Sequence, residues 1–317
     1  MTKIFTSARV ALTAAFVAAA TLAAPVAAYA GGGDKAVPMS KGFGGACPKC
    51  ELSGRNMSGA HFMGADFSGA TLVGSDLREA QFLGSNFTGA DLSGANMTDA
   101  RILGTIFTDA IMQRTRMRSA EAKGGQFGGA NMTEVDFTDA SATGAIFTKA
   151  ILTKAKFQST ELPAARFDKA DARGANFHDA NMEAANLTGG RFDKANFHST
   201  ELTMAVLTGG SFDDADFKDA SLHHAVIDGA DLSHARGLTQ DQIDEACGDA
   251  KTRLPKGLVL KNCGINIRAI IRQSIQTHVS VHAYPTPYAP PAPPAPPAPP
   301  APPPPYVSRY LVQPASN

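Results

Sequence analysis

The sequence predicts an all-β fold: a four-sided parallel β-helix of about nine coils, followed by a short helical cap and a proline-rich disordered tail. Three observations predict it. Large apolar residues recur every five positions, small residues lie two positions before them, and fourteen prolines fall between Pro285 and Pro305. The 317 residues carry no net charge and no Trp. This composition argues against a polybasic nucleic-acid binder, a membrane-spanning bundle and a coiled coil.

The five-residue period runs without interruption from Leu52 to Leu232, and only Ala122, Ala142 and Ala172 break the series of Leu, Ile, Met and Phe. A period of five fits neither a helix of 3.6 residues per turn nor a two-residue strand. It fits a chain that turns a corner every five residues, with a large and a small side chain pointing inward on each side. Four sides make a coil of twenty residues, and nine coils spaced by about 4.8 Å form a rod about 43 Å long.

The repeat also resembles a known family. Ala65-Asp66-Phe67-Ser68-Gly69 and Ala90-Asp91-Leu92-Ser93-Gly94 follow the pattern A(D/N)LxG, which is similar to the pentapeptide repeat family over roughly residues 50–235. We expect the β-helix itself to comprise residues 47–235. This resemblance implies a right-handed quadrilateral parallel β-helix.

The twenty-residue coil predicts which side chains stack in the core. One side should hold a column of phenylalanines that continues into Leu187, Leu207 and Ile227, and the opposite side should hold a second column. The members of the two columns are Phe67, Phe87, Phe107, Phe127, Phe147 and Phe167, and Phe137, Phe157, Phe177, Phe197 and Phe217. Because these positions point inward, we expect a core rather than a ligand groove.

Residues 1–30 read as a signal peptide. Lys3 and Arg9 flank a positive start, an apolar run follows, and Ala28-Tyr29-Ala30 predicts cleavage between Ala30 and Gly31. The run is shorter than the ~20 residues of a spanning helix, so the mature chain should have no stable membrane span. We expect export, to the periplasm or to the extracellular space, with residues 31–46 as a linker.

Beyond the repeat, residues 236–264 are expected to form a C-terminal cap. Thr239 and Gln242 have the spacing of a capping box, and Gly248 is a suitable helix stop. The resemblance to exported members of the family implies such a segment as well.

Four cysteines allow three pairings. A rod of about 40 Å separates Cys47 and Cys50 from Cys247 and Cys263, whereas a disulfide needs Cα atoms within about 7 Å. If both disulfides form, they are therefore Cys47–Cys50 and Cys247–Cys263. We interpret the first pair as structural, because its cysteines lie on inward positions of the repeat and lack the context of a redox motif.

The chain ends in three further segments. Residues 265–284 form a connector for which a helix and a strand both remain open. The Ala-Pro-Pro units of residues 285–305 predict a polyproline II spacer. Residues 306–317 form an apolar and aromatic tip, which is either part of a disordered tail or a peptide held out toward a partner.

No nucleophile–base pair, phosphate loop, dinucleotide fingerprint or zinc signature is present, so we expect neither an enzyme nor a bound cofactor. The leading hypothesis is an exported scaffold that binds an unknown envelope protein or peptide, with a homodimer also open and with no nucleic-acid partner. One alternative, implied by the resemblance, is a DNA-mimicking inhibitor of an enzyme such as gyrase, which the signal peptide disfavours. Another is a periplasmic metal-binding protein, whose weak candidate ligands are His178 and His198 on neighbouring coils.

Overall fold

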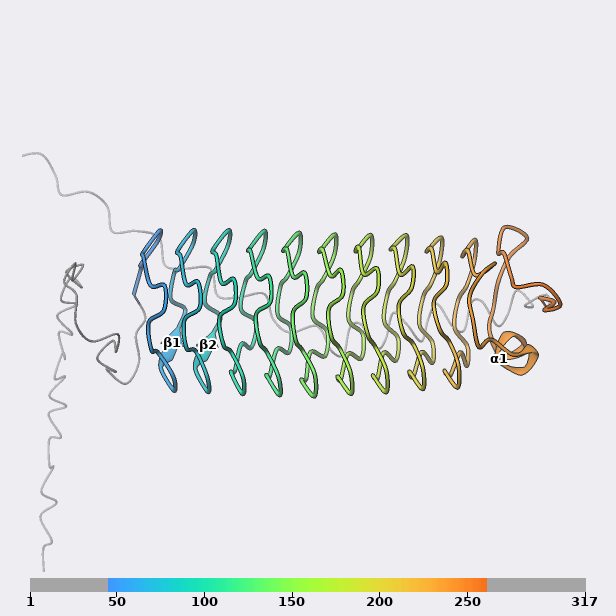
Figure 1. Cartoon of the computed structure of the whole chain (residues 1–317), viewed down its shortest axis with the longest axis horizontal. Coiled ribbons are helices and arrows are strands. Elements are labelled where there is room, and N and C mark those ends of the chain that lie inside the picture. Colours follow the sequence, from blue (N-terminus) through green and yellow to red (C-terminus); the bar gives the residue numbers. More distant parts are fainter. Residues whose placement is uncertain (1–44, 261–317) are drawn as a thin grey trace, which may run out of the picture. The chain divides into compact units, whose positions relative to one another are not determined.

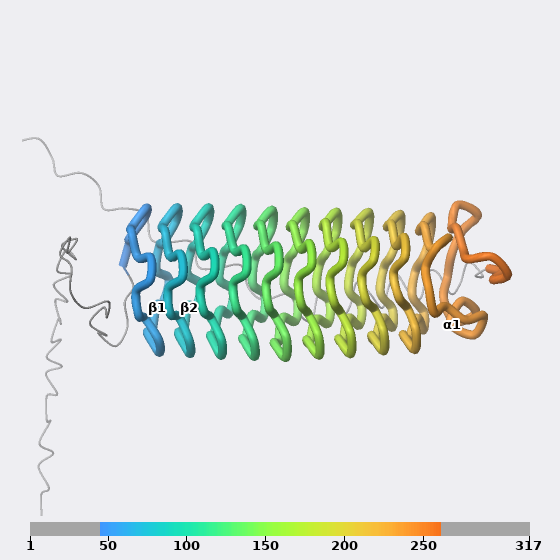
Figure 2. Tube along the Cα trace, in the orientation of Figure 1, coloured from blue at the N-terminus to red at the C-terminus, as the bar shows by residue number. Residues whose placement is uncertain are grey.

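The protein forms a parallel β-helix, drawn as a ribbon in Figure 1 and as a tube in Figure 2. The computed structural model describes residues 45–260. The predicted signal peptide, its cleavage point, Cys263, the connector, the proline-rich spacer and the tip lie outside the described residues. The named elements are β1 (His61–Met63), β2 (Gln81–Leu83) and α1 (Gln240–Glu245). Among residues 45–260, no helix has the length and apolar character needed to cross a membrane.

Parallel pairing between residues twenty positions apart builds the β-helix. Bridges of this spacing run from Ala46–Asp66 to Asp216–Arg236, and β1 pairs with β2 in the same register. A typical step has the Phe67 N–H donating to the Asn86 carbonyl at 2.7 Å. Each circuit therefore takes twenty residues, and the parallel β-helix expected from the five-residue period is confirmed.

A tight turn closes each corner of the coil. The Ala70 N–H donates to the Phe67 carbonyl at 3.0 Å across Ser68 and Gly69. The second turn residue has a positive φ at every corner from residue 49 to residue 229, with values of 54–68°. Glycine adopts this conformation freely, whereas Lys154, with φ of 57°, does so at a cost of roughly 1–2 kcal/mol. Stacking of the coils must outweigh that cost at the non-glycine corners.

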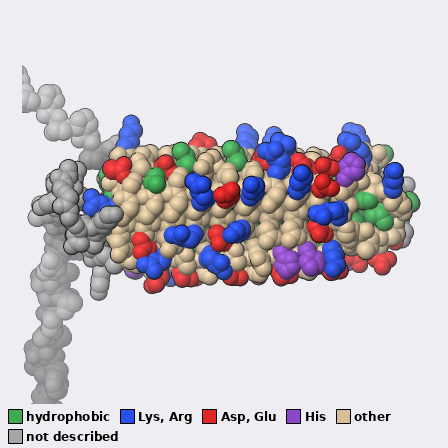
Figure 3. Space-filling view, in the orientation of Figure 1, with side chains coloured by type: hydrophobic (Ala, Val, Ile, Leu, Met, Phe, Trp, Pro, Cys, Tyr) green, Lys and Arg blue, Asp and Glu red, His purple; other side chains and the backbone are tan. Residues whose placement is uncertain are grey.

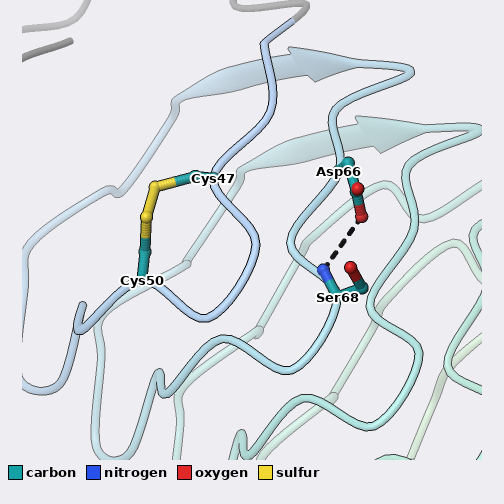
Figure 4. The surroundings of a disulfide bond; sticks show 4 residues. All are labelled: Cys47, Cys50, Asp66 and Ser68. Atoms are coloured by element: carbon teal, nitrogen blue, oxygen red, sulfur yellow. Dashed lines mark hydrogen bonds between the residues drawn. A yellow bond between two sulfur atoms is a disulfide. The ribbon is translucent and has the colours of Figure 1, made fainter. Parts of the chain in front are cut away.

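Where Asp or Asn precedes an inward centre, its side chain commonly stabilises the same corner. The Ser68 N–H donates to Asp66 Oδ1 at 3.0 Å, as Figure 4 shows, and the Thr88 N–H donates to Asn86 Oδ1 at the same distance. Asp and Asn side chains commonly accept a hydrogen bond from the backbone two residues on. This contact explains why Asp or Asn so often occupies the second place of the repeat.

The core contains the two phenylalanine columns in the places given by the twenty-residue register. Rings in the first column, from Phe67 to Phe167, stack with centroids 4.8–5.2 Å apart. Rings in the second, from Phe137 to Phe217, stack at 5.0–5.4 Å. The columns meet edge to face across the coil, for example at 5.8 Å between Phe127 and Phe137. Ala142 is buried on the side between Phe137 and Phe147, which leaves room for both rings.

Two further ring pairs extend this packing beyond the predicted columns. Phe62 stacks on Phe82 at 5.0 Å near the N-terminal end, and Phe192 stacks on Phe212 at 5.4 Å near the C-terminal end. Both pairs lie on the other two sides of the coil, and each touches a predicted column edge to face or at a tilt. The aromatic core thus moves from side to side along the β-helix.

Buried hydroxyls replace alanine at several of the small inward positions. The Thr160 hydroxyl donates to the Phe137 carbonyl at 2.8 Å, and the Thr200 hydroxyl donates to the Phe177 carbonyl at 2.7 Å. Each bond reaches from one coil to the preceding one and satisfies a polar group that is shielded from water. Threonine is therefore compatible with the core at this position.

The segment after the repeat packs onto the last coil. Helix α1 has the expected capping box between Thr239 and Gln242, and its Ile243 side chain is buried. The Gln242 side chain also donates to the Phe217 and Ala220 carbonyls at 3.0 and 2.7 Å. The helix therefore contributes an apolar contact and two hydrogen bonds to the end of the core.

One expectation for this segment was wrong. The helix ends at Glu245 with Ala246 as its C-cap, three positions before Gly248, because the chain turns there to rejoin the ladder. Beyond the end of the repeat, parallel pairing continues through Val226–Cys247 and Asp231–Arg253. The segment thus adds a partial layer whose spacing no longer follows the five-residue period, which is why the sequence pattern ends earlier.

Candidate interaction surface

The interior of the β-helix leaves no place for a binding or catalytic site. Inward side chains from Leu72 to Leu232 are apolar or small hydroxyl residues, and they are buried almost completely. Among residues 45–260, no group of three or more His, Cys, Asp or Glu side chains is placed to hold a metal ion. Any recognition chemistry of the described residues therefore lies on the outer surface.

The outer surface divides along the chain into three zones of different charge. Residues 52–110 have 3 basic and 6 acidic side chains, residues 111–173 have 10 and 7, and residues 174–235 have 3 and 10. Their net charges are −3, +3 and −7. Figure 3 shows basic and acidic side chains interspersed on the face drawn, with histidines toward the C-terminal end. Charge zones of this kind steer charged partners.

The basic zone is partly neutralised by the coil that follows it. Arg114 lies on one side of a coil, and Arg116 and Arg118 lie on the next side of the same coil. The Arg118 guanidinium lies 3.8 Å from the Asp136 carboxylate and 3.5 Å from that of Asp139, which are 18 and 21 residues further along the chain. These exposed ion pairs contribute little to stability.

Histidines in the acidic zone lie beside carboxylates. His234 Nδ1 is 2.7 Å from Asp213 Oδ1, and His223 Nδ1 is 4.0 Å from the Glu245 carboxylate in α1. Hydrogen bonds from Ser233 lower the pKa of Asp231, and the bond from its side chain is the larger cause. The Arg253 cation, 3.4 Å away, lowers this pKa further. The acidic band therefore has internal partners for several of its charges.

The two candidate metal ligands, His178 and His198, do come together, with ring centroids 4.8 Å apart. Each of them, however, faces a different carboxylate. His178 Nδ1 lies 2.8 Å from Asp179 Oδ2, an ion-pair distance without hydrogen-bond alignment, and His198 Nε2 lies 3.3 Å from Asp219 Oδ2. The stack follows from the twenty-residue register. In the described part of the chain it is not joined by the further ligand that a metal site would need.

Two arginine–aspartate pairs on the surface, which the sequence pattern did not reveal, are each joined by two hydrogen bonds. The Arg78 guanidinium donates to both Asp76 oxygens at 2.8 and 2.6 Å, and Arg173 does the same to Asp171 at 2.7 Å each. These hydrogen bonds lower the pKa of Asp76 and of Asp171. Each pair joins the residue before an inward centre to the residue after it. An Asp-x-Arg triplet with the inward centre as its middle residue is therefore the sequence signal that could have predicted these pairs.

The first described corner is closed by a disulfide between Cys47 and Cys50, with Cα atoms 5.4 Å apart (Figure 4). The two cysteines take the places of the large and small inward residues that flank every other corner, and they pack partly buried against the core. Cys247 is also disulfide-bonded. The Cys263 partner predicted for it lies outside the described residues.

Comparison with protein families identifies the repeat. A family described as pentapeptide repeats (8 copies) matches residues 49–84, 85–121, 130–167, 150–189 and 160–203. A second, described as pentapeptide repeats (9 copies), matches residues 192–236. Together the matches cover more than half of the chain. The search of curated proteins found no match.

Several solved structures are similar. HetL from the cyanobacterium Nostoc, a pentapeptide repeat protein involved in heterocyst differentiation regulation, is 21% identical with a TM-score of 0.42, over 67% of this chain and 92% of its own. QnrB1, a plasmid-mediated fluoroquinolone resistance protein, is 19% identical with a TM-score of 0.37, over 75% of this chain and 98% of its own. Rfr23 from the cyanobacterium Cyanothece is 21% identical with a TM-score of 0.25, over 40% and 69%.

Proposed function

The chain belongs to the pentapeptide repeat family, and from this premise we propose that it is a non-enzymatic scaffold exported to the cell envelope. In this function the β-helix presents a rigid surface to a protein or peptide partner. The observation that carries the proposal is the solid interior. Because the inward side chains fill the coil, binding has to use outward residues.

We further propose nine right-handed coils closed at the C-terminal end by residues 236–260. Backbone groups that point out of the last coil support the closing role. The Ile227 N–H donates to the Cys247 carbonyl at 2.7 Å, the Leu232 N–H to the Arg253 carbonyl at 2.8 Å, and the Gly229 N–H to Asp249 Oδ1 at 2.8 Å. A β-helix end without such partners would pair with other chains.

Export is supported by the N-terminal sequence. The charged start, the apolar run and Ala28-Tyr29-Ala30 are features that a signal peptidase recognises. The oxidised state of Cys47 and Cys50 fits an oxidising compartment.

A DNA-mimicking inhibitor is the second candidate, and the net charge of −7 on residues 174–235 favours it. The net charge of +3 on residues 111–173 opposes it, because a DNA mimic needs a continuous negative field. Inhibition of DNA gyrase supercoiling by the purified chain would establish this function in place of the scaffold.

The test of the scaffold is cross-linking and affinity purification from the cell envelope. We compare the full chain with one stopped at Tyr284, which lacks the proline-rich spacer and tip. A partner lost on truncation assigns recognition to the tail, and a partner retained assigns it to the β-helix surface. In the second case, Asp213→Asn with Asp214→Asn should weaken binding of a basic partner, whereas Arg114→Gln with Arg116→Gln serves as the matched control. Recovery of no envelope partner by any form contradicts the proposal.

A further inference from the structure

One side of the coil has a different outer surface from the other three. We call it the Phe62 side, because its inward centres run in twenty-residue steps from Phe62 to Leu222, and β1 and β2 lie on it (Figure 1). The second turn residue at its corner is uncharged on eight consecutive coils. These residues are Gly64, Gly84, Gly104, Gly124, Gly144, Ala164, Ala184 and Met204. Each of the other three sides has charged residues at this position, such as Arg114, Asp139 and Lys149.

The N-terminal half of the Phe62 side is apolar. The first turn residues of three consecutive coils are Met63, Leu83 and Leu103, which point away from the core. Met63 is 62% exposed, and the other two are partly exposed. Beside them, a β-carbon on Gly84 or Gly104 would meet no atom of residues 45–260 within 4 Å, so these corners have room for a side chain of another molecule. Contiguous apolar residues on an outer surface are a feature of contacts between proteins.

The charges of the Phe62 side are divided between its two halves. The outward charged residues are Arg101, Glu121 and Lys123 in the N-terminal half, and Glu161, Glu183 and Glu201 in the C-terminal half. The Arg101 guanidinium donates to the Glu121 carboxylate at 3.1 Å. The net charges of the halves are therefore +1 and −3. Because the signs differ, such a surface is complementary to itself when a second copy lies antiparallel on it.

We propose that the Phe62 side is the interface of an antiparallel homodimer, whose twofold axis crosses this side between the coils of Ala142 and Leu162. The apolar half of each copy, with its net positive charge, then faces the negative half of the other. About eight coils overlap, over a length of about 38 Å. With five residues across a side, at up to about 3.3 Å each, the contact takes about 600 Å² from each copy. The total of about 1,200 Å² is the lower end of the range for specific interfaces.

The charges favour this register over the two registers displaced from it by one coil. It places Arg101 opposite Glu201 of the second copy and, one coil nearer the axis, Lys123 opposite Glu183. The twofold axis repeats both contacts, and no like charges of the Phe62 side oppose each other. In either displaced register, glutamates of the two copies face each other. These are Glu121 with Glu161 in one direction, and Glu121 with Glu201 and Glu161 with itself in the other.

The sizes of the side chains agree with the same register. Met204 has a φ of 58°, a conformation that glycine adopts more easily, and it lies opposite Gly104, where there is room for it. Leu103 lies opposite Thr203, whose methyl group is apolar. Nearer the axis, the facing second turn residues are Gly124 and Ala184, and Gly144 and Ala164. These small residues let the two copies approach closely.

An exchange of charges tests this interface on the full chain. Arg101→Glu with Lys123→Glu opposes glutamates across the dimer, and Glu183→Lys with Glu201→Lys opposes cations. Alone, each double variant should dimerise at least about tenfold more weakly than the original chain in sedimentation equilibrium. Mixed in equal amounts, the two variants regain all the opposite-charge contacts. A heterodimer should therefore form with an affinity close to that of the original homodimer.

The matched control is Lys154→Glu with Lys156→Glu, which changes the net charge equally at exposed positions on other sides of the coil and should leave dimerisation unchanged. Arg101→Gln with Lys123→Gln removes the same cations without reversing the charge, and it should weaken the dimer in the same direction if the reversed variant folds poorly. An original chain that stays monomeric, a control that dissociates as much as the charge variants, or a mixture of folded variants that forms no heterodimer would each overturn the proposal. These measurements need no envelope partner, so they stand apart from the test of the proposed function.

Discussion

At the C-terminal end of the β-helix, hydrogen bonds from residues 236–253 serve the last coil, and the buried Ile243 packs on the core. At the N-terminal end, the first described corner is held by the Cys47–Cys50 disulfide, and Leu52 is only partly buried. The interior between them needs neither device, because each coil is covered on both sides. The comparison shows that the same five-residue pattern is enough to stabilise every interior coil, whereas each end requires residues outside that pattern.

The largest effect should come from the interior. Phe147→Ala removes a ring stacked at 5.0 and 4.8 Å between two others, and the cavity should lower the free energy of unfolding by roughly 3–5 kcal/mol. Phe217→Ala, near the closed C-terminal end, should cost a similar amount, and Phe62→Ala less. Urea denaturation measures all three. An unchanged midpoint for Phe147→Ala would contradict the stacked core, and equal costs for Phe62 and Phe147 would remove the difference between end and interior.

The C-terminal end should lose stability when its apolar contact is removed. Ile243→Ala should cost about 2–5 kcal/mol, because the side chain is 1% exposed and lies against the core. Lys256→Ala, at an exposed position of the same segment, is the matched control and should change little. Amide hydrogen exchange should show faster exchange at Ile227 and Leu232, which donate to this segment. Unaltered exchange there would mean that α1 does not hold the segment in place.

The N-terminal end should respond to loss of its covalent bond. Cys47→Ser combined with Cys50→Ser should lower the free energy of unfolding by about 2 kcal/mol or less, because the closed loop is very short. The loss should be confined to the first coil, so exchange should accelerate at Leu52 and Met57 and stay constant at Ile227. A loss of stability throughout the β-helix would show that the two ends are not independent.

The smallest effect should be a pH dependence of the C-terminal end. Burial acts to raise the pKa of Asp249, but hydrogen bonds from Gly229, Lys251 and Thr252 outweigh it and lower the pKa. A lowered pKa in the folded state means that this stabilisation is complete above the ordinary pKa of about 3.9 and is lost as the pH falls through the folded value. Asp249→Asn should therefore make the free energy of unfolding less dependent on pH in this acidic range, as measured by urea denaturation at several pH values. If the variant and the original chain lose stability equally as the pH falls, other carboxylates cause the pH dependence.

Much of the architecture could be predicted because the repeat is local and regular. The five-residue period is enough to identify the inward positions, the twenty-residue coil and the two long phenylalanine columns. It also brings His178 and His198 together, since residues twenty apart must be neighbours. The period says nothing about the direction of outward side chains. For that reason the Arg78–Asp76 pair and the histidine–carboxylate contacts were not foreseen.

The sequence by itself determined the fold, because a period that matches only a cornered coil admits few other ways to bury its apolar residues. Only the tertiary structure decided how the coil ends. The partial layer through Cys247 and Arg253 and the bonds of Gln242 to the last coil join residues at spacings of 21 to 25, outside any repeat. Such contacts depend on the path of one particular loop over one particular coil, and no periodic pattern encodes that path.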